Sequence, residues 1–477
     1  MRKIGELKTR KATEIASSRI GVGFETLDRK MWDDTDEVYR LTGELGVKHA
    51  RVQTGWCLCE QEAGVYDFAW LDRIVNNLLE QGVQPWFNVG YGNMLHTGAE
   101  HLDAVGWAPI YTEESRAAWS RFVAALVAHF RDRVTHYEIW NEPDIDVFWV
   151  SGSNPHDYMD LLKLTVPVVR HAYPGAKIIG GALAGGLGQR GAAYLEACLQ
   201  DGLAELIDVF TFHRYHILSE LHRPCDYASL RATFKAYGGE DIELWQAESG
   251  CPSVESKTQA LANVPVSEEV QAKVLARSIL NDMLHGLDYT SYFHLSDFKY
   301  YYRNGFTDVP NYFGLLTFDQ PVRCKPSYGV MQRICTLFDR DTQLMPRGLV
   351  EFSIEDFHNS PERYQFQEEI AAAKCGTFLR NGGPMAVWWQ PSDILPSVSG
   401  NELKPPRTIN VHVWTPQGVI GDPVVVDPLT GEVFEPGHKT NDICAGVDTG
   451  IQILTDVPLK DTPMVAVDRS SIDIVGA

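Results

Sequence analysis

Two glutamates occupy similar positions at the ends of short strand-like runs. Glu142 follows the run His136–Trp140 and precedes Pro143, which ends a strand because proline has no backbone N–H to donate. Glu248 ends a second such run, before a loop that contains glycine and proline. The two glutamates are 106 positions apart, which leaves room for three strand–helix units of about 35 residues each. In a barrel of parallel strands, both carboxylates would lie at the same rim.

Two carboxyl groups at one rim can divide the work of cleaving a glycosidic bond. One must be protonated to help the leaving oxygen depart, and the other must be ionised to attack the anomeric carbon. A single glutamate at a strand end is usually a solvated residue or a salt-bridge partner. The pairing of Glu142 with Glu248 favours the chemical interpretation.

The stretch Trp140-Asn141-Glu142-Pro143 resembles the strand-four signature of clan A glycoside hydrolases, and Glu248-Ser249-Gly250 resembles the strand-seven nucleophile segment of that clan. The resemblance implies that Glu142 is the acid/base, that Glu248 is the nucleophile, and that Asn141 binds the sugar 2-hydroxyl. It also implies retention of configuration, which requires the carboxylates to be about 5 Å apart. No cofactor is expected, because this reaction needs none.

Two further positions carry the same resemblance. His213-Arg214-Tyr215 resembles the His-x-Tyr segment of the clan, whose tyrosine hydrogen-bonds the nucleophile, and His213 is expected to bind substrate with it. Arg51 falls late in the second expected strand, where clan members often have an arginine that contacts the nucleophile. A fixed guanidinium there would keep Glu248 ionised, although a salt bridge at the barrel rim is the other interpretation of Arg51.

Aromatic residues near strand ends are expected to form the walls of sugar subsites, because sugar C–H faces stack on rings. The candidates are Trp56, Trp86, Tyr91, Trp107, Trp149, Tyr292 and Phe293, of which about half should touch substrate and the rest belong to the core. Trp56, Tyr91 and Trp149 are the first choices, together with His294, which ends the eighth strand where many clan members have a tryptophan. A metal site of His213, His216 and His294 is a minor alternative, since no carboxylate–histidine metal motif accompanies them.

Alternating short apolar and longer amphipathic segments predict an α/β fold, a (β/α)8 barrel, over residues 20–342. The eight expected strands are Ile20–Phe24, Lys48–Gln53, Gln84–Val89, Val134–Trp140, Lys177–Gly181, Ile207–His213, Ile242–Ala247 and Tyr289–His294. The expected helices include Trp70–Gln81, Glu113–Arg131, His156–His171, Tyr194–Gly202 and Glu268–His285. An open nucleotide-binding sheet is the alternative. It is disfavoured because the glycine-rich stretch Gly180–Gly188 has no P-loop lysine and follows a late strand.

Short β-like runs take over after about residue 343 and predict a C-terminal β-sandwich domain over residues 343–477. These runs are Met385–Gln390, Thr408–Thr415, Val424–Asp427, Gly450–Leu454 and Met464–Asp468. Residues 1–19 precede the first barrel strand and are expected to join this sandwich.

The bulk composition narrows the class of partner and the compartment. A formal net charge of −21 argues against nucleic-acid or anionic membrane partners, which usually bind clustered lysine and arginine. Nine scattered cysteines favour free thiols, and the charged N-terminus lacks the apolar stretch of a signal peptide. We therefore expect a cytoplasmic location; the oligomeric state cannot be predicted from the sequence.

The whole outline resembles glycoside hydrolase family 39, with Tyr66-Asp67-Phe68 before the second helix and the stretch Trp86–Asn93 at strand three. Members include β-xylosidases and other β- and some α-L-glycosidases, so the resemblance leaves the sugar open. The expected activity is exo-acting hydrolysis of small β-linked oligosaccharides or glycosides. The alternatives are an endo-acting β-glycanase and a barrel that binds carbohydrate without cleaving it.

Overall fold

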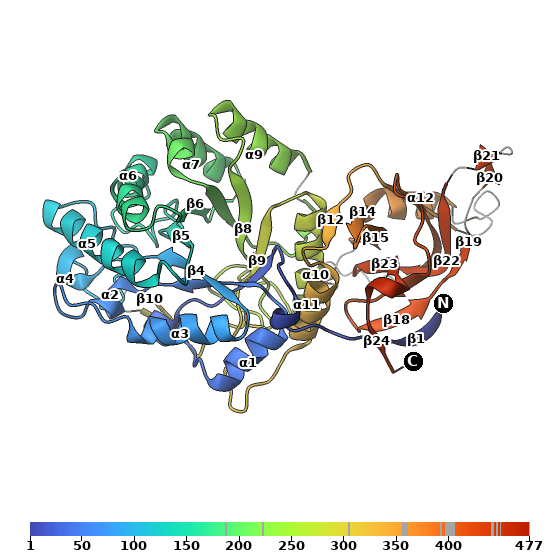
Figure 1. The fold of residues 1–477 in the computed structure, drawn as a ribbon, viewed down its shortest axis with the longest axis horizontal. Helices are drawn as coiled ribbons and strands as arrows, with labels where there is room; N and C mark the ends of the chain where they lie inside the picture. Colours follow the sequence, from blue (N-terminus) through green and yellow to red (C-terminus); the bar gives the residue numbers. More distant parts are fainter. Residues whose placement is uncertain are drawn as a thin grey trace.

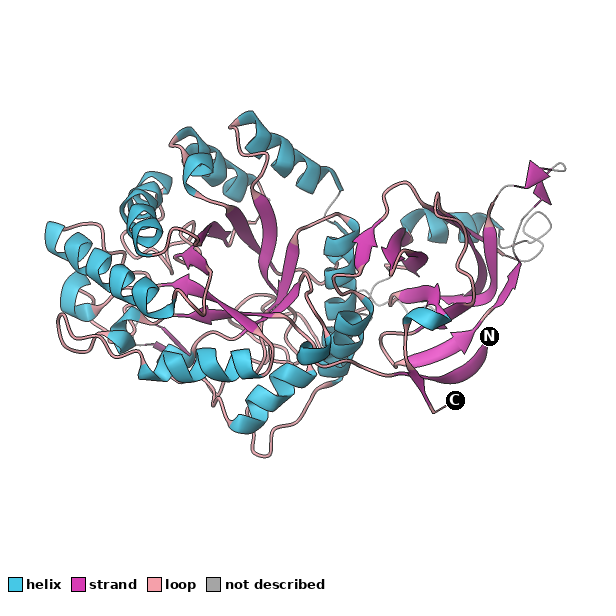
Figure 2. Cartoon of the chain, in the orientation of Figure 1, coloured by secondary structure: helices cyan, strands magenta, loops and turns pink. Residues whose placement is uncertain are grey.

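Eight parallel strands close into a barrel in the N-terminal two thirds of the computed structural model (Figures 1 and 2). The structure describes residues 1–476 except 187, 222–223, 304–305, 355–360, 362, 392–393, 396–405, 440–442, 445–446 and 449. The barrel strands, in order, are β2 (Ile20–Gly23), β3 (His49–Gln53), β4 (Gln84–Val89), β5 (His136–Ile139), β6 (Lys177–Leu183), β7 (Val209–Arg214), β8 (Glu243–Ser249) and β9 (Tyr289–Tyr292). All eight expected strands are confirmed, with ends that differ by at most two residues.

Helices surround the barrel on its outer side (Figure 2). They are α1 (Asp36–Glu44), α2 (Trp56–Cys59), α3 (Ala69–Glu80), α4 (Met94–Thr97), α5 (Glu113–Phe130), α6 (Pro155–Ala172), α7 (Gln189–Gln200), α8 (Leu203–Leu206), α9 (Pro224–Ala236), α10 (Glu268–Leu284) and α11 (Pro326–Leu337). The longest ones begin at side-chain caps: Thr112 accepts from Ser115 N before α5, and Ser267 accepts from Val270 N before α10. Four of the five expected helices agree with α3, α5, α6 and α10 within two residues, whereas α7 begins five residues before the expected Tyr194. The apolar stripes of these helices bury against the strands, which is the pattern that the periodicity detects.

A separate group of large side chains fills the barrel interior. Trp86, Trp245 and Tyr289 pack with Ile179 and Val209 there. These residues come from the middle or the beginning of their strands, so they close the barrel below its carboxyl rim. The two glutamates lie at the rim above this layer, while His49 and His136 contact Tyr289 and Trp245 from the beginnings of β3 and β5.

Two antiparallel sheets form a β-sandwich in the C-terminal part (Figure 1). One sheet has the order β12 (Thr342–Leu344), β14 (Lys374–Arg380), β15 (Gly383–Trp389), β23 (Met464–Asp468), β17 (Pro423–Val426), β18 (Glu432–Glu435), β1 (Arg2–Leu7) and β24 (Ile474–Val475). The other has the order β13 (Leu349–Ser353), β16 (Arg407–Trp414), β22 (Gln452–Leu459) and β19 (Gly437–Lys439). Apolar residues of both sheets and of α12 (Arg363–Ala372) form one core between them.

The first strand of the chain lies in the sandwich. β1 pairs with β18 and with β24, so both ends of the chain lie in the same sheet (Figure 1). The divisions at residues 19 and 342 stay predictions, because apolar contacts continue from barrel to sandwich. Val387, Trp389 and Val465 of the sandwich belong to the same buried cluster as the barrel helices.

The seven cysteines whose side chains are described are unpaired. Within the described residues, no helix is long and apolar enough to cross a membrane.

Candidate active site

Glu142 lies in the loop directly after β5, in a backbone conformation that few residues adopt. Its φ is 47°, and that of Trp140 is 71°, both in the left-handed region that non-glycine residues rarely occupy. Two contacts compensate for this: Glu142 N donates to Ala182 O at 3.0 Å, and the buried Asp144 accepts from Ala184 N and Gly185 N at 2.8 and 2.7 Å. The end of β6 and the loop after it therefore hold the Glu142 backbone in place. Conformations of this kind persist where the surroundings fix them.

Glu248 lies near the end of β8, the third strand after β5. The hydroxyl of Tyr215 donates to its Oε2 at 2.7 Å, and the guanidinium of Arg51 donates to its Oε1. The side chain is only 9% exposed. Glu248 thus has both oxygens held by donors, which is the environment of an ionised carboxylate.

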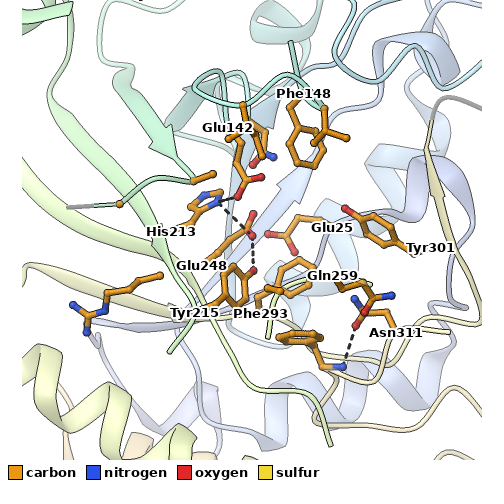
Figure 3. Close-up of a pocket in the computed structure, with 18 of the residues that line it drawn as sticks. Glu25, Glu142, Phe148, His213, Tyr215, Glu248, Gln259, Phe293, Tyr301 and Asn311 are labelled. Carbon is orange, nitrogen blue, oxygen red and sulfur yellow. Dashed lines mark hydrogen bonds and ion pairs between the residues drawn. The ribbon is translucent and has the colours of Figure 1, made fainter. Parts of the chain in front are cut away.

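The two carboxyl groups meet across the imidazole of His213. A carboxylate oxygen of each glutamate and a ring nitrogen of His213 all lie within 4.8 Å of one another (Figure 3). His213 Nδ1 is 2.8 Å from Glu142 Oε1 and 3.5 Å from Glu248 Oε2. The rim positions expected from the sequence therefore bring the two carboxyl groups close together.

The same three side chains are the only group among the described residues that is close enough to hold a metal ion. Their donor atoms are already engaged with one another, with Tyr215 and with Arg51, whose positive charge a cation would have to approach. The alternative set of His213, His216 and His294 is not brought together. We therefore assign no metal ion to Glu142 and Glu248.

Burial and charge shift the pKa values of Glu142, His213 and Tyr215. Burial raises the pKa of Glu142, and the negative charge of Glu248 adds to this, while the hydrogen bond with His213 opposes it. Burial lowers the pKa of His213, but the charges of Glu248 and Glu142 outweigh it and hold that pKa above the usual value. Burial and the charge of Glu248 hold the pKa of Tyr215 well above its usual range, so its hydroxyl remains a donor.

Arg51 lies behind the cavity wall and connects several polar side chains of the site. Its guanidinium donates to Glu138 Oε2, to Glu25 Oε1 and to Asn141 Oδ1, in addition to Glu248. It is fully buried and is not part of the cavity wall. Its expected place as a substrate-binding residue is corrected accordingly: Arg51 contacts Glu248, which faces the cavity, as its strand position indicated, but does not line the cavity itself.

A cavity of about 680 Å³ opens over the acids. Four of the expected substrate-binding residues, Tyr91, Asn141, His213 and Tyr215, line it. Because Asn141 Oδ1 accepts from Arg51 at 2.7 Å, the amide group presents its N–H donors to other partners. Of the seven candidate aromatic residues, only Tyr91 and Phe293 belong to the described cavity wall.

Trp56 and Trp149 do not reach the cavity, so their expected role as subsite walls is wrong. Both are completely buried. Trp56 stacks on His96 and Phe122 beneath the rim, and its Nε1 donates to Glu60 at 2.5 Å. Trp149 packs against Trp140 and donates to the hydroxyl of Tyr111 at 2.9 Å.

His294 also lies behind the cavity wall. Its Nε2 accepts the backbone N–H of Glu25 at 2.8 Å, and its ring packs edge-on against Trp32 and Phe298. Its expected role in binding sugar is therefore corrected to support of the loop after β2.

Residues that the sequence did not suggest complete the site. Glu138 accepts from Arg51 and from Asn88 Nδ2, which places a third acid behind the pair, and Glu25 lines the cavity. Other new wall residues come from the end of β3 and from the segments after β2, β5, β8 and β9: Arg29, Gln53, Ile145, Phe148, Gln259, Tyr301, Asn311 and Phe313. The available signal for Glu25 and Asn88 was the one used for Glu142, a polar residue late in an apolar strand.

Comparisons with known proteins decide the family. The sequence profile of glycosyl hydrolases family 39 matches residues 7–342. The chain belongs to this family. A β-xylosidase of Geobacillus stearothermophilus is 24% identical over 157 residues, which cover 31% of each protein, so this match spans about a third of that relative.

Solved structures share the fold. A family 39 glycoside hydrolase from the gut symbiont Bacteroides cellulosilyticus WH2 superposes with a TM-score of 0.64 at 19% identity, over 94% of this chain and 81% of that one. A GH30 endoxylanase from Clostridium papyrosolvens C71 gives a TM-score of 0.59 at 11% identity, over 97% and 98% of the chains. At these identities the likeness concerns the barrel and sandwich alone.

Proposed function

We propose that this member of family 39 is a retaining glycoside hydrolase with Glu142 as acid/base and Glu248 as nucleophile. The observation that carries the proposal is the spacing of the acids, whose nearest oxygens lie within 4.8 Å. Retaining enzymes separate their carboxyl groups by about 5 Å, whereas inverting enzymes leave roughly 6.5 to 9.5 Å for a water molecule.

In the first step, Glu142 gives its proton to the glycosidic oxygen while an oxygen of Glu248 bonds to the anomeric carbon and the carbon–oxygen bond to the leaving group breaks. In the second step, Glu142 takes a proton from water, whose oxygen bonds to the anomeric carbon and displaces Glu248. Arg51 and Tyr215 stabilise the ionised form of Glu248 in the resting state and after it departs. No cofactor takes part.

A cavity of about 680 Å³ has the size of a small-molecule site, which supports exo-action on small β-linked oligosaccharides or glycosides. Residues 259–261, from the loop after β8, and Tyr301 contribute to its wall. The β-xylosidase activity named for the Geobacillus relative makes β-xylosides the first substrates to test. We further propose a cytoplasmic location, on the basis of the seven unpaired cysteines among the described residues.

The test is a panel of aryl glycosides that contains β-xyloside, β-glucoside, β-galactoside, β-mannoside and α-L-arabinoside, with the anomer of the first product followed by NMR. Turnover with retained configuration supports the proposal and names the sugar. Inversion contradicts the covalent role of Glu248. If the protein cleaved xylan or another polymer but none of the aryl glycosides, the proposal of exo-action would be replaced by one of endo-action.

Glu248→Gln separates an enzyme from a protein that only binds carbohydrate. The substitution keeps the size of the side chain but removes its nucleophilic charge, so turnover is lost while sugar affinity measured by calorimetry remains. A wild-type protein that binds a sugar of the panel and never cleaves it would contradict the enzymatic proposal.

A further inference from the structure

One side chain of the sandwich packs with loops of the barrel that carry the active site. Ile394, in the segment after β15, is only 3% exposed. It forms a buried apolar cluster with Cys251 and with Val274 of α10. Four partly buried residues pack against this cluster: Ile217, Leu261, Val266 and Val270. Among the described members of the cluster, Ile394 alone comes from the sandwich.

The barrel members of the cluster are close to site residues along the chain. Cys251 comes three residues after Glu248, and Ile217 comes two residues after Tyr215. Leu261 both lines the cavity and packs against the cluster. The cluster therefore lies directly behind the cavity wall that Leu261 forms.

The barrel side of the cluster is fixed by hydrogen bonds. The carbonyl oxygen of Cys251 accepts from Gln271 Nε2 of α10 at 3.0 Å and from the hydroxyl of Tyr292 at 3.1 Å. α10 lies on the side of the barrel that faces the sandwich, where Lys273 pairs with Asp461 of the sandwich at 2.7 Å (Figure 1). Ile394 thus packs against a part of the barrel that is held in place.

The wall segment that contains Leu261 has an unusual backbone. The φ angles of Gln259, Leu261 and Asn263 are 81°, 59° and 61°, all in the left-handed region that non-glycine residues rarely occupy. Such conformations persist where the surroundings fix them. Asn263 N donates to Ser256 O at 2.7 Å, which ties the loop to itself. The packing of Leu261 against the cluster ties the same loop to the rest of the molecule.

The two acids are held by contacts outside this cluster. Glu142 N donates to Ala182 O, and the carboxylate of Glu248 accepts from Arg51 and Tyr215. None of these partners belongs to the cluster of Ile394. A disturbance at Ile394 should therefore change the shape of the cavity wall more than the position of the acids.

We propose that Ile394 is a positioning residue for the substrate cavity. Through Leu261 it holds the wall at residues 259–261 in its strained conformation. The sandwich then takes part in substrate binding without contacting the substrate. The inference rests on the proposed function and adds to it a role for the sandwich in shaping the cavity.

Ile394→Ala tests this role, because it leaves a void in the cluster and removes the packing that restrains the strained loop. For the best p-nitrophenyl glycoside of the panel, we expect KM to rise by about three- to tenfold while kcat changes by less than about twofold. Ile394→Leu, which keeps the volume, should restore a KM close to the wild-type value. If Ile394→Ala does not fold, Ile394→Val should give a smaller rise of KM in the same direction.

Ile409→Ala is the matched control. Ile409 is 2% exposed and lies in the core between the two sheets, a cluster whose described members all belong to the sandwich. Its truncation should lower the unfolding temperature to a similar extent and leave KM unchanged in assays well below that temperature. An equal rise of KM in both alanine variants would contradict the proposal. So would a wild-type KM in Ile394→Ala, or a fall of kcat at unchanged KM.

Hydrogen exchange of the free protein separates this inference from the proposed function, because it needs no substrate. Peptides that contain the amide of Asn263 should exchange faster in Ile394→Ala than in the wild type or in Ile409→Ala. Unchanged exchange in these peptides would overturn the inference even in an active enzyme. The expected exchange difference in a protein that cleaves none of the glycosides would support the positioning of the wall and contradict the hydrolase proposal alone.

Discussion

Glu142 and Glu248 have the same side chain, and their neighbours give them different chemistry. Glu142 is buried beside an imidazole and another acid, and burial raises its pKa. Glu248 accepts from the guanidinium of Arg51 and the hydroxyl of Tyr215, both of which favour its ionised form. Such a difference in surroundings supports the proposed roles of Glu142 as the acid and Glu248 as the nucleophile.

Glu142→Gln should distinguish the acid from the nucleophile through the leaving group. Without a proton donor, kcat/KM for an alkyl glycoside, whose leaving oxygen must be protonated, should fall by about 10² to 10⁴-fold. A dinitrophenyl glycoside, whose leaving group needs no protonation, should show little loss in the first step. Burst kinetics with the dinitrophenyl substrate measures that step; equal losses for both substrates would contradict the assignment.

The pH profile should report the contact between Glu142 and His213. Because Glu142 must be protonated to act as the acid, kcat/KM falls as the pH rises through its pKa. The hydrogen bond with His213 opposes the rise in that pKa, so His213→Phe should shift the basic limb to higher pH. Stopped assays from pH 4 to 9 would measure this, and an unmoved limb would show that another group controls it.

Arg51 neutralises several buried acids, so its loss should be costly and pH-dependent. Glu25, Glu138 and Glu248 all contact its guanidinium. Arg51→Met should reduce the free energy of unfolding by about 3 to 5 kcal/mol or more near neutral pH, because it leaves buried charges unpaired. Arg51→Lys keeps the charge and should lose less.

The sign of this pH dependence follows from the acids. Burial raises the pKa of Glu25, but contacts with His294 and Arg51 outweigh it and hold that pKa below its usual value. Without Arg51 the pKa of Glu25 in the folded state rises, so the folded variant favours the protonated acid and loses stability as the pH rises through that pKa. Chemical denaturation at pH 5 and pH 8 should show a larger deficit for Arg51→Met at pH 8. A larger deficit at pH 5 would contradict the charge account.

For single residues, the predicted positions were correct where a motif fixes the geometry and wrong where only the residue type was available. Glu142, Glu248 and Tyr215 lie in strand-end motifs and meet at the rim. Trp56 and Trp149 also follow strands, but large aromatic rings beneath a rim are equally suited to packing. Which way such a ring points depends on neighbours that a linear pattern does not name.

Among the elements, the loop after β6 is the one that most directly positions the proposed acid, Glu142. Through Asp144 it is bonded to the loop that carries Glu142, with backbone donors at Ala184 and Gly185. Asp144→Ala leaves two backbone donors unpaired and should lower kcat by up to about 10²-fold by misplacing the acid. KM should change much less. Steady-state kinetics decides this, and a change confined to KM would place Asp144 in substrate binding instead.

Barrel elements were more predictable than sandwich elements for a physical reason. Buried parallel strands appear as continuous apolar runs and their helices as amphipathic segments, so each strand–helix unit can be predicted from its own local sequence pattern. In the sandwich, β15, β16, β17 and β23 match the expected runs, and β22 overlaps the expected run Gly450–Leu454 only over residues 452–454. The expected runs did not include β13 or β14. The pairing of β1 with β18 joins opposite ends of the chain, and a register of that kind is set by tertiary contacts.

Across the whole molecule, barrel and sandwich share polar and apolar contacts. Trp389 of the sandwich donates to Glu220 at 2.7 Å, and Glu220 also pairs with Arg277 of α10. Arg10 and Arg380 both pair with Asp339 near the end of the barrel. These contacts support the sandwich as a structural partner of the barrel.

Trp389→Phe should therefore weaken the joint without disturbing the acids. It keeps the ring in the shared core but leaves Glu220 with one donor fewer, at a cost of about 1 to 3 kcal/mol in the free energy of unfolding. Activity below the unfolding temperature should be unchanged. Differential scanning calorimetry should show one transition, at lower temperature; two separated transitions in the wild-type protein would show that barrel and sandwich unfold independently.

The central claim, that Glu248 attacks the anomeric carbon, can be measured directly by mass spectrometry. A 2-deoxy-2-fluoro glycosyl fluoride of the sugar that the enzyme cleaves slows release of the covalent intermediate more than its formation. After incubation, the intact protein should gain the mass of one fluorosugar, and peptide mapping should place it on Glu248. An inactivated protein without an adduct, or an adduct on another residue, would contradict the account.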